Sequence, residues 1–267
     1  MKIDCVLTSC NLVPLYLDFV PIFIQAWNKL YPYIEVKIIL IADQIPENLI
    51  EYSKYLILFP YCNSISSAFI SQYIRLLYPA ILSYENGILI TDIDIIPMNK
   101  TYFSKNIEPF FNDRFIVYRD VLINDYKEIA MCYNVATKEL WSAIFNINTI
   151  DDIKNRLLEV YSSIDYDDSK KHGGGNWNKD QKDLYNYLEN YSKLNDNKVI
   201  VLSDKSTGFL RLDRNTFKIS NELIAFINRG GFSDYHMYRP YNDYKEINDR
   251  ITSLLSSAGL LTSMNLL

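Results

Sequence analysis

Two aspartates separated by one residue, Asp92 and Asp94, are the side chains of this sequence whose type and spacing most clearly suggest chemistry. Alternate residues of an extended chain point to the same side, so the two carboxylates are expected to face one way. Two like charges held this close raise each other's pKa unless a cation lies between them. A divalent metal ion with oxygen ligands is the simplest such cation, so the pair predicts a metal site.

The residues around the pair favour a metal site over the alternative, in which both aspartates only cap a turn. An apolar run at residues 88–90 precedes the pair, and Ile95 and Ile96 follow it. Pro97 ends the run, because proline cannot donate to a central ladder. The pattern predicts a buried strand, where charged residues are seldom found unless they are paired or bound to metal.

Strands and helices alternate over the first hundred residues. This order predicts an α/β fold with a Rossmann-like, mostly parallel central sheet and helices on both faces. The expected strands are 3–8, 35–42, 55–59 and the aspartate strand, and the expected helices are 14–30, 46–52 and 66–83. In such sheets the ligand crevice lies beyond the carboxyl ends of the strands. We therefore expect Thr8, Ser9 and Asn11, at the end of the first strand, to share the crevice with the aspartates.

The second half of the chain predicts shorter elements. Strands are expected at 114–119, 128–135, 199–202 and 209–212, and helices at 101–111, 138–147, 151–161, 177–191 and 244–255. Residues 165–175 are polar and glycine-rich, which is typical of a mobile surface loop. His172 lies in this loop, and we expect no fixed role for it. No internal repeat or linker is visible, so we expect a single domain over residues 1–267.

Composition narrows the class of protein. Of 267 residues, 49% are apolar, which is enough for a substantial core, and the net charge is −5. An acidic chain argues against non-specific nucleic-acid binding, so an anionic ligand must be bound by metal or by a few placed basic residues. The four cysteines form no C-x-x-C pair, which favours reduced thiols. With no signal-peptide pattern and no run long enough to span a bilayer, we expect a soluble, cytoplasmic protein.

Two further pairs of polar residues lie on expected helices. Ser71 and Arg75 share one helix face, and the arginine could neutralise phosphate oxygens by forked hydrogen bonds; the alternative is a solvated surface arginine. Asp180 and Gln181 open the helix after the glycine-rich loop. There the alternative is N-terminal capping by Asn178 or Asp180, and both roles can hold at once.

Two single residues complete the candidates. His236 is one of only two histidines, and in a late polar loop it could fold back on the aspartates as a third metal ligand, although a lone histidine is more often an ordinary surface or core residue. Asn134 is polar within an apolar strand, where a buried amide needs partners. It either ties neighbouring backbone or faces the crevice and binds a hydroxylated ligand.

Taken together, these residues resemble a nucleotide-sugar glycosyltransferase of the GT-A fold. The resemblance rests on the strand end at Thr8 and Ser9, the Ser71 and Arg75 helix, the Asp-x-Asp pair, and the later helix opened by Asp180 and Gln181. It covers about residues 1–240, and the order and spacing are similar to those of the glycogenin-like retaining transferases. Composition and brevity are also similar to glycosyltransferases of large DNA viruses, which is a weaker resemblance.

The resemblance implies Mn²⁺ or Mg²⁺ held by Asp92, Asp94 and His236. It also implies a UDP-sugar donor, less readily a GDP-sugar, a saccharide or other hydroxyl acceptor, and transfer with retention. The donor-binding residues would be Thr8, Ser9, Asn11, Ser71, Arg75, Asp92 and Asn134, and the catalytic residues Asp180 and Gln181. Residues 1–98 would form the nucleotide-binding half, 99–245 the donor-sugar and acceptor half, and 246–267 a C-terminal helix and tail. The loop at 165–175 would close over the donor and exclude water.

The sequence departs from this family near His236, because the usual glycine-rich and Lys-Pro-Trp elements are absent. Two other functions stay open. A phosphatase of the haloacid dehalogenase type also uses a carboxylate pair after an apolar strand, but there the strand usually comes first in the chain and a Thr or Val stands where this chain has Ile96. The other alternative is a non-catalytic nucleotide-sugar binding protein.

Overall fold

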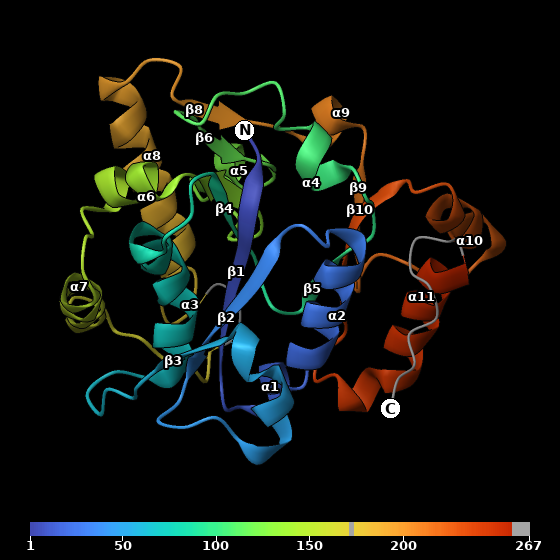
Figure 1. The fold of residues 1–267 in the computed structure, drawn as a ribbon, viewed down its shortest axis with the longest axis horizontal. Coiled ribbons are helices and arrows are strands. Elements are labelled where there is room, and N and C mark those ends of the chain that lie inside the picture. The colour runs from blue at the N-terminus through green and yellow to red at the C-terminus, as the bar shows by residue number, and fades with distance from the viewer. Residues whose placement is uncertain (171–173, 258–267) are drawn as a thin grey trace.

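The computed structural model describes residues 1–170 and 174–257, and in this part of the chain a seven-stranded sheet lies at the centre (Figure 1). Its strand order is β3-β2-β1-β4-β7-β6-β8. The strands are β1 (Ile3–Asn11), β2 (Glu35–Ile41), β3 (Leu56–Phe59), β4 (Gly87–Ile90), β6 (Phe115–Val117), β7 (Asn134–Ala136) and β8 (Val199–Val201). Strand β7 runs antiparallel to β4 and β6, and the other neighbours are parallel. The expected mostly parallel α/β fold is confirmed.

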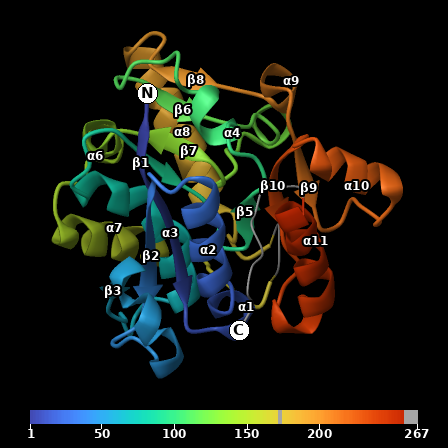
Figure 2. The same cartoon turned by 45° about the vertical axis from the view of Figure 1, so that its right-hand side comes forward.

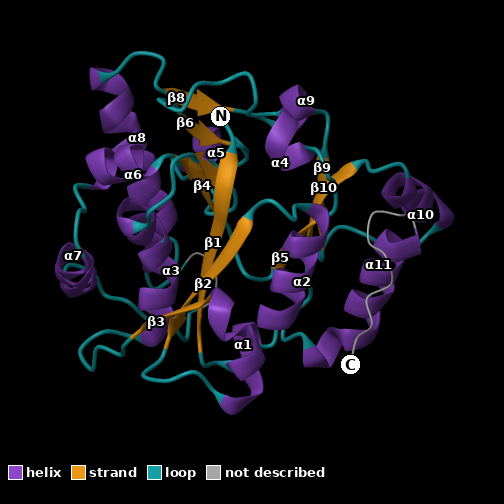
Figure 3. Ribbon diagram, viewed as in Figure 1, coloured by secondary structure: helices purple, strands orange, loops and turns teal. Residues whose placement is uncertain are grey.

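Both faces of this sheet are buried under helices (Figure 3). Along β1, Val6 faces one core while Cys5 and Leu7 face the other. This is why its strands are near-continuous apolar runs, as in parallel sheets covered on both sides. Helix α2 (Val20–Leu30) packs in the first core, and α3 (Ser67–Leu77), α6 (Lys138–Phe145), α7 (Ile150–Ser162) and α8 (Lys179–Leu194) pack in the second.

Prolines divide two helices that the sequence pattern joins. The expected helix 14–30 is α1 (Pro14–Leu17) followed by α2, in which Pro21 occupies the first turn. Proline lacks an N–H and its ring clashes with the carbonyl four residues earlier, so it is tolerated only where a helix begins. In the same way, α3 ends before Pro79, and a 3₁₀ helix, η2 (Tyr78–Ile81), follows it. The expected helix 46–52 is also 3₁₀, η1 (Glu47–Tyr55).

A second sheet lies beside the first, and most of it was not expected. Its strand order is β5-β10-β9, with bounds β5 (Ile95–Pro97), β10 (Phe232–His236) and β9 (Leu210–Asp213). The sequence predicts a polar loop around His236, and this is wrong: β10 pairs antiparallel with β5 and parallel with β9. Helices α10 (Asn221–Asn228) and α11 (Lys245–Ser257) lie beside this sheet (Figure 2).

The remaining elements are short. They are α4 (Tyr102–Lys105), α5 (Ile123–Tyr126), α9 (Asp204–Thr207) and η3 (Asn242–Tyr244). The expected strand at 128–135 is reduced to β7, because Tyr133 has a φ of 67° and the chain cannot stay extended through it. Helix α7 begins with a capping box formed by Thr149 and Asp152. No helix among the described residues is long and apolar enough to cross a membrane.

Candidate functional site

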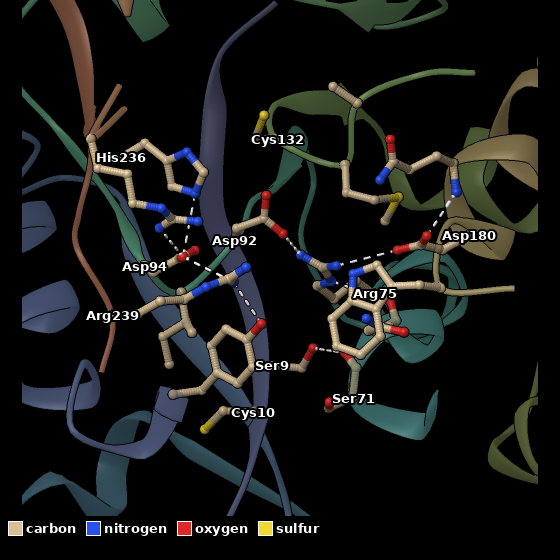
Figure 4. A pocket seen from close by; sticks show the side chains of 18 of the residues that line it. Ser9, Cys10, Ser71, Arg75, Asp92, Asp94, Cys132, Asp180, His236 and Arg239 are labelled. Atoms are coloured by element: carbon tan, nitrogen blue, oxygen red, sulfur yellow. Dashed lines mark hydrogen bonds and ion pairs between the residues drawn. The ribbon is translucent and has the colours of Figure 1, made fainter. Parts of the chain in front are cut away.

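A pocket opens where β1 and β4 end, at the carboxyl edge of the central sheet (Figure 4). The two strands are parallel, and the Thr91 N–H donates to the Leu7 carbonyl at 3.1 Å, so the segments that follow them emerge side by side. Residues from both strand ends and from helices α3 and α8 line the pocket: Ser9, Cys10, Asp92, Asp94, Ser71, Arg75, Asp180 and Gln181. The crevice predicted at the strand ends is therefore present.

Arg75 lies between two carboxylates at one side of the pocket. Its Nη1 donates to Asp92, and its Nη2 lies 3.4 Å from Asp180 Oδ2. Nη1 also donates to the Thr91 carbonyl at 3.2 Å. The Arg75 side chain is 8% exposed, so the alternative of a solvated surface arginine is wrong. The arginine fixes the Asp92 carboxylate and joins α3 to the first turn of α8.

Asp180 is a buried carboxyl with an unusual ionisation. Burial raises its pKa to about 7, against the opposing effect of Arg75 and with a smaller raising effect of Asp92. Its Oδ1 accepts from the Gln181 N–H at 2.9 Å, and Tyr166 is a further titratable neighbour. Asn178 occupies the N-cap position of α8 without a capping bond and donates instead to Glu128 Oε1 at 2.5 Å. In the first turn of α8, Asp180 therefore contacts both the backbone of the helix and Arg75 of α3.

Replacing Asp180 by Asn should stabilise the protein above pH 7. The wild-type carboxyl ionises near pH 4 when unfolded and near pH 7 when folded, so its burial costs stability progressively between these pH values. We expect Asp180→Asn to gain about 1–2 kcal/mol at pH 8, with Tm higher by about 2–4 °C per kcal/mol, and to show little of this gain at pH 4. Thermal unfolding from pH 4 to 8 checks this, and a variant less stable at pH 8 would contradict it.

Asp94 is buried at the other side of the pocket among cationic side chains. Its Oδ2 lies 2.9 Å from Arg214 Nη1, 3.3 Å from Arg239 Nη1 and 3.3 Å from His236 Nε2. Burial opposes ionisation of this carboxyl, but His236, Arg239 and Arg214 outweigh it and hold its pKa well below the usual range. Asp94 is therefore a buried carboxylate that organises three cationic or potentially cationic groups.

The small sheet brings these groups to Asp94. Strand β5 begins directly after Asp94, and β10 pairs with it, so that the Met237 N–H donates to the Asp94 carbonyl at 2.9 Å. His236 also pairs in register with Asp213 of β9, whose Oδ2 lies 2.9 Å from His236 Nδ1. Burial lowers the pKa of His236, but Asp94 and Asp213 raise it by more, so the net pKa lies above the usual value. Arg214 directly follows β9.

The expected metal ligands are near one another, but their arrangement does not fit a divalent ion. Asp92 contacts Arg75, whereas Asp94 faces Arg214, Arg239 and His236. Among residues 1–170 and 174–257, no group of three or more His, Cys, Asp or Glu side chains is placed to hold a metal. Arginine binds Asp92 Oδ1 and Asp94 Oδ2, so an ion between the two aspartates would lie close to guanidinium groups on both sides, against the repulsion of like charges. The three residues that the resemblance implies as ligands therefore line one pocket, but both aspartates are paired with arginine.

Of the other predicted donor-binding residues, some line the pocket and some do not. Ser9 and Ser71 line the pocket, and the Ser9 hydroxyl donates to the Ser71 carbonyl. Thr8 is fully buried, and its Oγ1 has no hydrogen-bond partner among the described residues. Asn11 is buried and donates to Ser67 Oγ at 3.1 Å. The two sequence interpretations of Asn134 resolve in favour of tying the backbone, since its Nδ2 donates to the Ala130 carbonyl at 2.9 Å.

Most of the basic residues of the pocket were not predicted from the sequence. Arg211, Arg214 and Arg239 line it together with Arg75. Arg211 donates to Asp234 Oδ2 at 2.5 Å, and Arg239 donates to the Tyr16 hydroxyl at 2.6 Å. The alternation at residues 210–213, in which Leu212 is buried between Arg211 and Asp213, is the sequence signal that could have indicated charged residues on one side of a strand.

The polar loop at residues 165–175 is only partly within the described structure. Residues 171–173, including His172, lie outside the described residues. Of the remainder, Tyr166 donates to Gln72 Oε1 at 2.9 Å, and Ser66 donates to Asp168 Oδ2 at 3.2 Å. Gln72 lies on α3, the helix that supplies Ser71 and Arg75, and Ser66 is the N-cap of that helix.

Solved structures share this fold at low sequence identity. No protein-family model and no curated protein sequence matches the chain. A crystal structure of the galactosyltransferase LgtC in complex with donor and acceptor sugar analogs is 14% identical, with a TM-score of 0.50, and 98% of each chain is covered. A crystal structure of the glycosyltransferase GlyE of Streptococcus pneumoniae TIGR4 is also 14% identical with a TM-score of 0.50; 96% of this chain and 63% of that chain are covered. The architecture is therefore of the GT-A type.

Proposed function

We propose that this protein transfers a sugar from a nucleoside-diphosphate sugar to a hydroxyl group of a saccharide or another acceptor. The observation that supports this most is the pocket at the ends of β1 and β4, where Arg75, Arg214 and Arg239 gather beside aspartates. In a chain with a net charge of −5, such a local group of cations suits an anionic ligand. The GT-A architecture adds support, because the similar LgtC structure contains donor and acceptor sugar analogs.

Within this proposal, a UDP-sugar is the first donor to test and a GDP-sugar the second, following the resemblance in sequence. Arg75, with Ser9 and Ser71, would face the nucleotide and diphosphate, and Asp180 and Gln181 the sugar. Asp180, which is largely buried, and Gln181 both line the pocket, so both can contact a sugar placed next to the diphosphate. Retention of the anomeric configuration is the outcome that the resemblance favours, and NMR of the product would test it.

The chemical demand on this pocket is to stabilise a leaving group. During transfer, the bond between the anomeric carbon and the diphosphate breaks, and the diphosphate keeps the electron pair. The acceptor oxygen bonds to the carbon, and its proton passes to an oxygen of the departing diphosphate. Cations placed where this charge develops lower the barrier, more strongly in a site from which water is excluded. The Mn²⁺ or Mg²⁺ expected from the sequence is not part of this proposal, because arginines already face both aspartates.

A donor panel tests the function. We expect release of nucleoside diphosphate from at least one UDP-, GDP- or dTDP-sugar when saccharide acceptors are present, measured separately in EDTA and in Mn²⁺. Gln181→Ala should lower the transfer rate about tenfold by losing a polar contact to the sugar. Gln44→Ala is the matched control, since Gln44 is exposed and outside the pocket.

The outcomes of this panel also decide between the other functions. Binding of a nucleotide sugar without turnover would indicate the non-catalytic binding protein. Release of inorganic phosphate from phosphate esters would indicate the phosphatase, which the fold of the similar solved structures does not favour.

A further inference from the structure

Asp94 contacts cationic side chains, whereas an aspartate that binds a metal ion has the metal as its cation. One oxygen of this carboxylate, Oδ2, is approached by Arg214, Arg239 and His236. The Asp94 side chain is 3% exposed, whereas the side chains of Arg214 and Arg239 are 11% and 19% exposed. A single buried carboxylate therefore faces two guanidinium groups that both line the pocket. His236, the third group at this oxygen, also contacts Asp213 on its other side.

Both arginines are fixed in position by other parts of the chain. Arg214 Nη1 donates to the Met237 carbonyl as well as to Asp94, and the Arg214 N–H donates to the His236 carbonyl at 3.2 Å. Arg239 donates to the Tyr16 hydroxyl, and its guanidinium lies 5.2 Å from the centre of the Tyr16 ring. Cationic groups held in advance lose little conformational entropy when they bind an anion.

The chemistry of these groups matches a diphosphate. A guanidinium presents N–H donors in a planar fork that fits two phosphate oxygens, and its charge-assisted hydrogen bonds are about twice as strong as neutral ones. Figure 4 shows Arg239, Asp94 and His236 at one side of the pocket and Arg75 and Asp180 at the other, with Asp92 between them. An anion that enters the pocket can reach the cations near Asp94 while Asp92 stays bound to Arg75.

We infer that Arg214 and Arg239 bind the donor's diphosphate in place of a divalent metal ion, so that this chain binds its donor without metal. The inference rests on the proposed function, because it names how the donor of that reaction is held. Asp94 then acts as a positioning residue, which keeps the two arginines and His236 together instead of ligating a metal. Arg214 and Arg239 neutralise the diphosphate when it binds and when it leaves.

The test is calorimetric titration of the full-length protein with inorganic pyrophosphate and with UDP, in EDTA and then in Mn²⁺ or Mg²⁺. We expect both ligands to bind in EDTA. Arg214→Gln and Arg239→Gln should each weaken binding at least about tenfold in EDTA, the effect of losing a charge-assisted hydrogen bond. Each variant leaves Asp94 with two of its three partners, so both should fold. Arg229→Gln is the matched control, because Arg229 is exposed and outside the pocket.

Binding of pyrophosphate and UDP that disappears in EDTA and returns with Mn²⁺ or Mg²⁺ would overturn the inference. Unchanged binding in both arginine variants would overturn it as well. The donor panel separates these failures from that of the proposed function. If transfer occurs only with added metal, the inference about Arg214 and Arg239 is wrong and the proposed transferase function stands. If pyrophosphate binds in EDTA but no nucleotide sugar is turned over, the proposed transferase function is wrong and the binding of diphosphate by Arg214 and Arg239 stands.

Discussion

Replacing Asp94 by Asn is expected to lower the free energy of unfolding by about 3 kcal/mol at pH 7, because removal of one partner leaves buried charges uncompensated. Arg214, Arg239 and His236 all face the Asp94 carboxylate, whose side chain is 3% exposed. An amide of the same shape offers them an oxygen but no charge. For a chain of this size, Tm should fall by about 2–4 °C for each kcal/mol, which thermal unfolding measures.

The loss of unfolding free energy caused by Asp94→Asn should depend on pH. The pKa of Asp94 is depressed in the folded protein, because its cationic neighbours outweigh the effect of burial. The stability that it contributes is therefore complete above the pKa of the unfolded chain, near pH 4, and falls as the pH is lowered further. The difference between variant and wild type should shrink below about pH 4. Equal loss at every pH would show that packing, and not charge, explains the effect.

Asp92→Asn is the matched control for Asp94→Asn, since it makes the same chemical change two residues earlier. The Asp92 side chain is 32% exposed, and Arg75, its partner, also lies near Asp180. Water and Asp180 can therefore compensate for the lost charge, and we expect a loss of less than about 1 kcal/mol. A loss as large as that of Asp94→Asn would contradict the assignment of Asp94 as the organising carboxylate.

Replacing Arg75 by Met should lower the free energy of unfolding by a similar amount, about 3 kcal/mol at pH 8. Arg75 lowers the pKa of Asp180 against the raising effect of burial, so its loss moves that pKa further above 7. A carboxyl whose folded pKa is raised costs stability as the pH rises toward that pKa. The loss should therefore be larger at pH 8 than at pH 5, which unfolding by denaturant at the two pH values would measure.

Two further variants show whether Asp180 explains the effect of Arg75→Met. Arg75→Met combined with Asp180→Asn should recover much of the lost stability at pH 8, because the uncompensated carboxyl is gone, and the double-mutant cycle gives the coupling. Arg75→Lys should be intermediate, since an ammonium group keeps the charge but lacks the fork that spans Asp92 and Asp180. Additive effects in the cycle would reject the coupling.

Local sequence patterns were sufficient for the central part of this fold. The apolar runs of β1, β2 and β4 predicted strands buried on both faces, and the helices between them predicted a mostly parallel sheet. Because the carboxyl ends of parallel strands meet at one edge, the sequence also indicated that Ser9 and the Asp92 and Asp94 pair would share a crevice. Arg75 and Asp180 were predicted for the same site, although nothing in the sequence showed that they contact each other.

Sequence by itself therefore determined the central sheet and the edge at which the aspartates lie, because these follow from the periodicity of neighbouring residues. The expectation that Asp92 and Asp94 lie on an extended strand and face one way is wrong, since they lie in the turn between β4 and β5 and contact different arginines. Tertiary structure decided the charge environment of Asp94. Arg214 and Arg239 are 120 and 145 residues away from it along the chain, and they reach it only because β10 pairs with both β5 and β9. Periodicity shows which side of a strand is buried, but the partner across from a buried charge depends on pairing between distant segments.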